Sequence, residues 1–157
     1  MATSYGGYMG RVVEIDLTTQ TVSDYPWTDE DRKLFIGGKI MAARILDKFL
    51  TGNENPLSEE VPLVISTGPL TGTGAPCSGR FNISALSPQT GHLASSNCGG
   101  TFGLFLKKAG LDALIIRGAC PEHTWLVIEN GDVTFRSADD DDARRARFPR
   151  IPIFPRC

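Results

Sequence analysis

The sequence predicts an α+β domain with antiparallel-rich β-sheets and two helices. About seven short stretches have the alternating apolar and polar pattern, or the short apolar run, of strands. Two longer stretches have the helical period, and they do not alternate with the strands as βαβ units would. Asn130-Gly131 separates two of the strand-like stretches. This dipeptide is typical of a tight hairpin, which joins antiparallel strands.

The individual elements follow from these periods. The expected strands cover residues 11–17, 21–25, 61–66, 80–86, 111–117, 124–129 and 132–136. The apolar face of the first expected helix, residues 39–50, consists of Ile40, Ala43, Leu46 and Leu50. The face of the second, residues 99–109, consists of Phe102, Phe105, Leu106 and Ala109. Thr28 precedes three acidic residues and would also suit a helix start.

Composition limits the class of protein. The chain has 157 residues, of which 41% are hydrophobic and 22% charged, as in ordinary globular domains. The net charge of −2 gives no reason to expect the clustered basic surface that binds nucleic acid. No apolar run is long enough to span a membrane, and the N-terminus lacks a signal-peptide pattern. We therefore expect a cytoplasmic protein that binds neither nucleic acid nor a membrane.

The C-terminal stretch differs in composition from the rest. Residues 1–136 are expected to form the domain, whereas residues 137–157 are rich in arginine, aspartate and proline and contain no glycine. Two interpretations fit this tail. It is either a solvated, disordered segment or the product of a reading frame lost near residue 137.

The cysteines and histidines do not predict a metal site. Cys77, Cys98, Cys120 and Cys157 contain no Cys-x-x-Cys pair, which a zinc ribbon or a local iron–sulfur site would need. Reduced thiols are expected, because nothing indicates export to an oxidising compartment. With only two histidines, the chain would not supply the ligands of a metal site by itself.

A glycine-rich loop is the first candidate binding feature. Residues 68–80, with the sequence GPLTGTGAPCSGR, connect two expected strands. Such a loop can present several backbone N–H groups to an anion, and Arg80 could pair with a phosphate. The loop lacks the Gly-Lys-Ser/Thr ending of a Walker motif. A long structural turn is the alternative interpretation.

Two further glycine-rich segments precede the expected helices. Residues 95–100, SSNCGG, would form a loop in which Ser96 or Asn97 caps the second helix. The carbonyl oxygen of the Asn97 side chain also suits magnesium. Gly37-Gly38-Lys39 precedes the first helix, and its lysine could face a phosphate or water. The three loops fit a large phosphorylated ligand, and they also fit a turn-rich domain without one.

Six motifs in order resemble a known family. They are GRVVEIDLT (10–18), FIGGK (35–39), STGPLTGTGAPCSGRFN (66–82), SPQTG (87–91), SSNCGGTFG (95–103) and LKKAGLDALIIRG (106–118). With this order and spacing, the chain resembles the N-terminal domain of the aldehyde ferredoxin oxidoreductase family of tungsten enzymes. The resemblance covers residues 8–135. It implies an α+β base built of two similar halves.

The resemblance also implies a cofactor. In that family tungsten, or sometimes molybdenum, is bound by the dithiolenes of two pterins whose phosphates are bridged by magnesium. The cofactor-binding positions that it implies here are Lys39, Gly74, Arg80, Ser96, Asn97, Gly99 and Gly100. Asn97 would offer its side chain to the magnesium ion. No residue of this chain is expected to be catalytic or to ligate the iron–sulfur cluster of the family.

The implied activity is the oxidation of aldehydes to carboxylic acids with ferredoxin as electron acceptor. The expected partners are the remaining domains of such an enzyme, or a separate chain that supplies them, and ferredoxin. An open docking surface would also favour a homodimer. Alone, the chain is expected to be inactive. The alternative is a non-catalytic subunit, or a pterin-binding or assembly module, that pairs with another chain.

Overall fold

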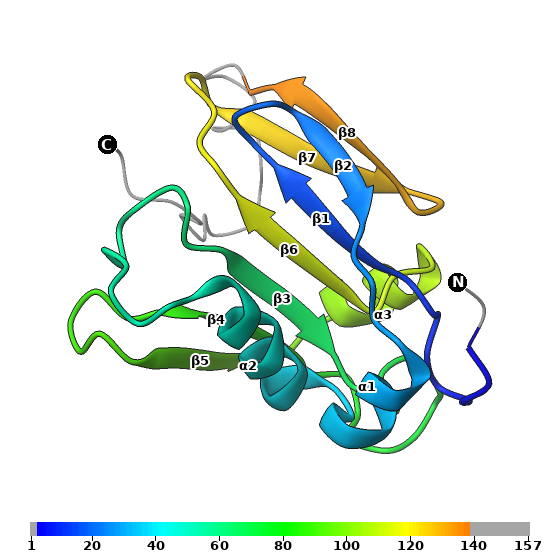
Figure 1. Ribbon diagram of the computed structural model, residues 1–157. Coiled ribbons are helices and arrows are strands. Elements are labelled where there is room, and N and C mark those ends of the chain that lie inside the picture. Colours follow the sequence, from blue (N-terminus) through cyan, green and yellow to red (C-terminus); the bar gives the residue numbers. More distant parts are fainter. Residues whose placement is uncertain (1–2, 139–157) are drawn as a thin grey trace.

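The computed structural model describes residues 3–138, which form two sheets and three helices (Figure 1). The strands are β1 (Val12–Asp16), β2 (Thr21–Asp24), β3 (Leu63–Thr67), β4 (Phe81–Leu86), β5 (Leu93–Cys98), β6 (Ala113–Arg117), β7 (Thr124–Glu129) and β8 (Asp132–Ser137). The helices are α1 (Asp29–Phe35), α2 (Gly38–Phe49) and α3 (Phe102–Lys108). The predicted α+β class is confirmed.

Antiparallel pairing dominates, as the sequence predicts. The large sheet has the order β2-β1-β6-β3-β4-β5, and only its β1–β6 pair is parallel. The second sheet is the β7–β8 hairpin. Asn130 and Gly131 turn this hairpin with φ angles of 53° and 87°, which confirms the predicted turn. The described residues thus divide unequally between a six-stranded and a two-stranded sheet.

Residues 3–138 contain one helix and one strand more than the two helices and seven strands counted from the sequence. The helix start predicted at Thr28 is confirmed. α1 is a third helix, and its start is closed by a capping box in which the Thr28 side chain accepts the Asp31 N–H and the Asp31 side chain accepts the Thr28 N–H. β5 is an additional strand where a loop was expected. Of the predicted tail, Ser137 belongs to β8, and residues 139–157 lie outside the described part of the chain.

The large sheet is covered on both faces. α2 packs on one face, where Met41, Ile45 and Leu46 join Val64 and Ile115 in a buried cluster. The other face is covered by α3 and by the β7–β8 hairpin. Figure 1 shows α1 and α2 on the near side of the sheet, with α3 beyond it. No helix among residues 3–138 has the length and hydropathy to span a bilayer.

The helices bury only part of the predicted faces: Leu46 and Leu106 are buried as predicted, whereas Ile40, Phe102 and Phe105 are exposed. In α2 the buried residues are Met41, Ala42, Ile45 and Leu46, while Ile40 is 55% exposed. The apolar residues of this segment lie on more than one face of the helix, so the helical period alone does not determine which face is buried. In α3 Phe102 and Phe105 are exposed, and Gly103 and Lys107 face inward. Tertiary contacts of Gly103 and Lys107, described below, set this rotation.

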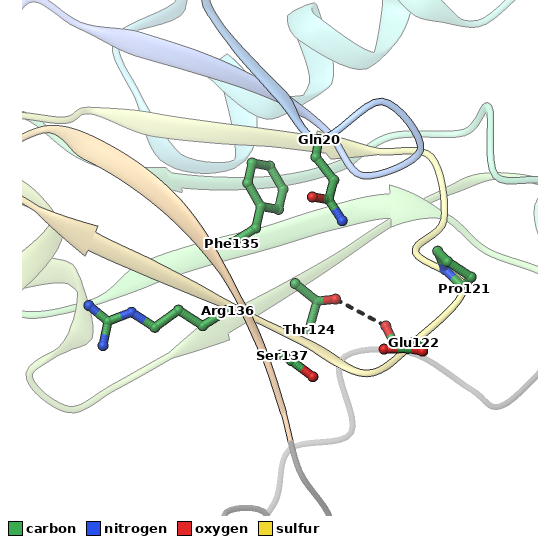
Figure 2. A pocket seen from close by; sticks show the side chains of 7 residues that line it. All are labelled: Gln20, Pro121, Glu122, Thr124, Phe135, Arg136 and Ser137. Carbon is green, nitrogen blue, oxygen red and sulfur yellow. Dashed lines mark hydrogen bonds between the residues drawn. The ribbon is translucent and has the colours of Figure 1, made fainter.

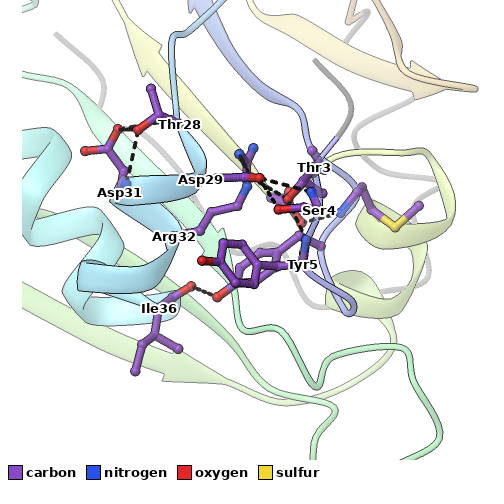
Figure 3. A network of polar contacts seen from close by, with 12 residues as sticks. Thr3, Ser4, Tyr5, Thr28, Asp29, Asp31, Arg32 and Ile36 are labelled. Carbon is purple, nitrogen blue, oxygen red and sulfur yellow. Dashed lines mark hydrogen bonds and ion pairs between the residues drawn. The ribbon is translucent and has the colours of Figure 1, made fainter.

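Asp29 ties the N-terminal segment to α1 (Figure 3). Its carboxylate accepts hydrogen bonds from the Ser4 hydroxyl (2.6 Å), the Thr3 hydroxyl (2.6 Å), the Ser4 N–H (3.0 Å) and Arg32 Nη1 (3.0 Å). These hydrogen bonds, those from Ser4 and Thr3 above all, hold the pKa of Asp29 well below its usual range. The segment lies beside the start of the loop of residues 68–80, because a Cβ atom added at Gly7 would lie 3.1 Å from the Pro69 carbonyl carbon.

Ile36 ends α1 in a strained conformation. Its φ and ψ angles are 44° and −74°, and its side chain is 53% exposed. A β-branched residue at positive φ is a genuine outlier. The carbonyl oxygen of Ile36 is held in place by the Tyr8 hydroxyl, which donates to it at 2.6 Å.

Replacing Ile36 with glycine should therefore raise the free energy of unfolding by about 1 kcal/mol. The relief of roughly 1–3 kcal/mol of backbone strain exceeds the extra entropy, roughly 0.5–1 kcal/mol, that glycine gains on unfolding. Urea denaturation measures the change. The control is Leu34→Gly, which lies inside α1 with an exposed side chain and should destabilise by about 1 kcal/mol. If Ile36→Gly instead lowers the free energy of unfolding, then the backbone at Ile36 is not strained.

Candidate functional site

The three glycine-rich segments meet at one end of the large sheet. Thr67, at the end of β3, pairs with Phe81 at the start of β4, and Phe81 pairs with Cys98 at the end of β5. The segment before α2 and the segment before α3 reach the same end. Residues 37–39, 68–80 and 99–100 therefore converge, although they are far apart in the sequence. We call this the glycine end of the sheet.

Gly37 brings the first two segments into direct contact. A Cβ atom added at Gly37 would lie 2.7 Å from the Thr67 carbonyl oxygen and 3.1 Å from the Gly68 Cα. Both neighbours are backbone, so neither can turn away. The Ser66 hydroxyl also donates to the Gly38 carbonyl oxygen at 3.0 Å. The start of α2 is thus packed directly against the end of β3.

Thr71 closes the loop of residues 68–80. Its side chain is buried, and its hydroxyl donates to the Arg80 carbonyl oxygen at 3.2 Å and accepts the Gly68 N–H at 3.3 Å. Its methyl group would lie 3.2 Å from a Cβ atom added at Gly103 in α3. Both ends of the loop and the start of α3 are therefore fixed to one another through this threonine.

The structure brings together most of the predicted site residues. Arg80 directly precedes β4, and Gly99 and Gly100 directly follow β5, so the strand register places them at the same end. A Cβ atom added at Gly79 would lie 3.9 Å from the Gly100 carbonyl oxygen, which confirms this proximity. All seven predicted positions are exposed: Lys39, Gly74, Arg80, Ser96, Asn97, Gly99 and Gly100.

Two predicted positions are less closely joined to the others. Lys39 lies in the first turn of α2 and is connected to the loop of residues 68–80 only through the backbone of Gly37 and Gly38. Gly74 lies within that loop at a φ of 84°, and no described atom lies within 4 Å of a Cβ added there. The geometry gives Gly74 no contact with the rest of the site.

The expected loop of residues 95–100 is wrong. Residues up to Cys98 form the edge strand β5, in which Asn97 pairs with Asn82 and Ser96 with Ile83. The predicted capping of α3 by Ser96 or Asn97 is also wrong, because Thr101 is the N-cap residue and its side chain makes no cap hydrogen bond. The strand escaped prediction because Ser95, Ser96 and Asn97 are consecutive polar residues, so the segment lacks the alternation that marks a half-buried strand.

Asn82 is a site residue that the sequence analysis missed. It is 2% exposed and lies in β4, directly opposite Asn97 of β5. Its amide nitrogen donates to Ser95 Oγ (2.8 Å), to Asn97 Oδ1 (3.0 Å) and to the Ser96 carbonyl oxygen (3.2 Å), while its Oδ1 accepts from the Ser84 hydroxyl (2.7 Å). The signal in the sequence was an asparagine and a serine at alternate positions of one strand, which places both on the same face.

Charge and capping favour an anion at the glycine end. Lys39 and Arg80 are exposed there. The N-terminus of α2 has no acidic residue in its first turn and no side-chain cap, whereas α1 has a capping box and three acidic residues. The free N–H groups of α2 therefore carry an uncompensated positive dipole end. Lys107 adds no free charge, because its ion pair with Asp112 is buried.

The donor set does not suit a metal bound directly by side chains. Among residues 3–138 no three His, Cys, Asp or Glu side chains come close enough together to hold an ion. The free cysteines Cys77, Cys98 and Cys120 are not clustered with such residues. Backbone N–H groups, hydroxyls, amides, a lysine and an arginine instead suit the phosphates of an organic group, which would have to carry its own metal.

Two surface hollows lie near the ends of the sheet. One, of about 270 Å³, borders the glycine end between the N-terminal segment at Tyr8, the loop at Gly72 and α3. The other, of about 160 Å³, lies beyond the opposite end, between Gln20 and the hairpin residues Phe135 and Arg136 (Figure 2). None of the predicted site residues lines this second hollow.

Comparisons with known proteins identify the family. The family model "Aldehyde ferredoxin oxidoreductase, N-terminal domain" matches residues 12–145. The chain belongs to the aldehyde ferredoxin oxidoreductase family. It is 38% identical to the tungsten-containing aldehyde ferredoxin oxidoreductase of Pyrococcus abyssi, over 84% of this chain and 22% of that protein. The corresponding enzyme of Thermococcus kodakarensis is 37% identical over 85% of this chain and 22% of its own length.

Two further proteins that resemble the chain have other substrates in their names. The chain is 36% identical to the WOR-like subunit of an aliphatic sulfonate oxidoreductase from Pyrococcus furiosus, over 83% of this chain and 21% of that subunit. The solved active-site complex BamBC of benzoyl coenzyme A reductase, with bound 1,5-dienoyl-CoA, has 36% identity and a TM-score of 0.81, over 84% of this chain and 20% of that one. The chain thus spans about a fifth of the length of the proteins that it resembles, and these proteins are named for different substrates.

Proposed function

We propose that this chain is the N-terminal, cofactor-supporting domain of a tungsten or molybdenum bis-pterin oxidoreductase that oxidises aldehydes to carboxylic acids with ferredoxin as acceptor. The observation that carries the proposal is the convergence of three glycine-rich segments, with Lys39 and Arg80, at one end of the sheet. The names of the tungsten-containing relatives support the metal. When bound, the metal–pterin group would supply the two-electron oxidation of the aldehyde, with water as the source of the added oxygen and ferredoxin as the acceptor of the electrons.

The residues of this chain would hold and orient the cofactor. Arg80 and Lys39 would pair with phosphate oxygens. Gly99 and Gly100 would let the backbone approach the pterin. Ser96 and Asn97 would contribute neutral polar groups beside a magnesium ion that bridges the phosphates. No residue of the chain is assigned to the chemical step or to iron–sulfur ligation.

Gly99 provides a test that separates binding from folding. A Cβ atom added at Gly99 would meet no described atom within 4 Å, and the residue has no positive φ. The fold therefore does not require glycine there, whereas close approach of a ligand would. We expect Gly99→Ala to leave the free energy of unfolding within about 0.5 kcal/mol and to weaken binding of a phosphorylated pterin about tenfold.

The measurement is a fluorescence titration of the 157-residue chain with neopterin triphosphate. Arg80→Ala should weaken binding about ten- to a hundredfold, because a hydrogen bond to a charged group is worth roughly 1.5–3 kcal/mol. Arg136→Ala is the matched control, since Arg136 is exposed and lines the other hollow. Equal affinities of all three variants and the unmodified chain would refute the proposed site.

A second candidate is a non-catalytic subunit that pairs with a separate chain carrying the other domains. It is favoured by the similar solved structure of benzoyl coenzyme A reductase, because that structure is a complex, BamBC. Affinity purification of the tagged chain from its own cells distinguishes the two. Recovery of a larger partner related to the remainder of the family supports the subunit, and repeated recovery of none opposes it.

A further inference from the structure

The exposed end of β5 is held in place by the buried side chain of Asn82, which lies in the neighbouring strand β4. Asn82 is 2% exposed and Ser84 is 1% exposed, whereas Ser95, Ser96 and Asn97 are all exposed. Asn82 and Asn97 are cross-strand partners, as are Ser84 and Ser95. Opposite partners in a sheet share a face. These four residues therefore form one polar cluster that runs from the interior to the surface.

Asn82 acts only as a donor toward β5. Its amide nitrogen donates to Ser95 Oγ at 2.8 Å and to Asn97 Oδ1 at 3.0 Å, while its own oxygen is occupied by the Ser84 hydroxyl at 2.7 Å. The Ser96 carbonyl oxygen, which can only accept, receives a hydrogen bond from the same amide nitrogen at 3.2 Å and therefore fixes which end of the Asn82 amide points toward β5. An asparagine amide has two donor hydrogens and one acceptor oxygen, so the cluster has a defined polarity.

This polarity determines what β5 presents to the outside. Because Ser95 and Asn97 accept from Asn82 through their oxygens, the Ser95 O–H and the Asn97 NH₂ remain to donate outward. The Asn97 oxygen has a partly positive amide hydrogen beside it, which makes it a poor ligand for a cation. Two outward donors on the strand that pairs with β4, which Arg80 directly precedes, suit an anion instead.

We propose that Asn82 is a positioning residue that fixes Ser95 and Asn97 as hydrogen-bond donors toward a phosphate group. This inference rests on the proposed function and refines it. It assigns the Asn97 side chain to a phosphate, and not to the bridging magnesium ion that the family resemblance implied.

The test is NMR titration of the isotope-labelled chain, separately with inorganic phosphate and with Mn²⁺. In the unmodified chain, phosphate should shift the Asn97 side-chain NH₂ resonance, and Mn²⁺ should not broaden it. Asn97→Ala and Ser95→Ala change exposed residues, and each leaves the buried Asn82 amide two of its three acceptors on β5, so the fold should tolerate them. Each should weaken phosphate binding about tenfold.

Asn82→Asp is the decisive variant because it has nearly the same shape and the opposite polarity. Its carboxylate would accept from Ser95 and Asn97, which turns the Asn97 oxygen outward. We expect phosphate binding to fall at least about tenfold, and Mn²⁺ to broaden the Asn97 resonance. The added charge alone could also attract Mn²⁺, so the double variant Asn82→Asp/Asn97→Ala is the control, and it should lose Mn²⁺ affinity.

The outcomes are distinguishable. Broadening of the Asn97 resonance by Mn²⁺ in the unmodified chain, or no response of that resonance to phosphate, would overturn the inference. Phosphate affinity unchanged in Asn97→Ala and Ser95→Ala would also overturn it, even if Asn82→Asp fails to fold. The proposed function would still stand in these cases if neopterin triphosphate binding depends on Arg80 and Gly99, and it would fail separately if it does not.

Discussion

Replacing Lys107 with methionine should lower the free energy of unfolding by about 3–5 kcal/mol. Lys107 is 4% exposed and Asp112 is 1% exposed, and the two form a buried ion pair. The lysine also donates to the Gly7 carbonyl oxygen at 2.9 Å. Without it, the Asp112 carboxylate would remain buried without a counter-charge, which is costly in a low-dielectric interior. Urea denaturation monitored by tryptophan fluorescence measures the loss.

The effect should spread to the N-terminal segment. The Asp112 carboxylate also accepts the N–H groups of Met9 (3.0 Å) and Gly10 (2.8 Å), so the pair ties that segment to α3. Lys108→Met is the matched control, because it removes the same charge from an exposed neighbour and should cost less than about 0.5 kcal/mol. Adding Asp112→Asn to Lys107→Met should recover part of the loss, since the buried charge is removed. Equal stabilities of the two lysine variants would refute this interpretation.

Gly37→Ala should have the second-largest effect, a loss of about 1–3 kcal/mol. The φ angle of Gly37 is 172°, which any residue adopts, so the cost is purely steric. The new methyl group would lie 2.7 Å from the Thr67 carbonyl oxygen and would push the start of α2 away from β3. Lys39 would move with it, away from the loop of residues 68–80.

Gly99→Ala is the matched control for this prediction as well, because it adds the same methyl group to open space at the same end of the sheet. Thermal unfolding of both variants compares their stability, and NMR shifts of residues 67–69 report the displacement. If Gly37→Ala unfolds at the same temperature as Gly99→Ala, then the close packing of α2 against β3 does not constrain the fold.

Elements with a strong local signal were predictable from the sequence. The apolar alternation of β1 and β4 and the Asn-Gly turn of the last hairpin identified their strands near the observed bounds. β5 was not predictable from its own residues. Its position depends on pairing with β4 and on the hydrogen bonds from Asn82, and both are tertiary interactions.

The candidate site, too, was predictable where the signal is local and unpredictable where it depends on tertiary contacts. Arg80, Gly99 and Gly100 were identified by motif, and the register of β4 and β5 explains why they lie together. The role of Gly37 depends on an approach between segments about thirty residues apart, and no local pattern predicts such a contact. The inward turn of Lys107 likewise depends on Asp112, which lies beyond the end of its helix. Helical periodicity alone therefore assigned the wrong face to α3.

The central claim is that the glycine end of the sheet binds a phosphorylated pterin, and chemical-shift mapping tests it most directly. The isotope-labelled chain is titrated with neopterin triphosphate, and the backbone amide resonances are followed. The claim predicts that the largest shifts fall at Lys39, Arg80, Asn97, Gly99 and Gly100, while the hollow near Phe135 and Arg136 does not respond. Shifts centred on that hollow, or none at saturating ligand, would contradict it.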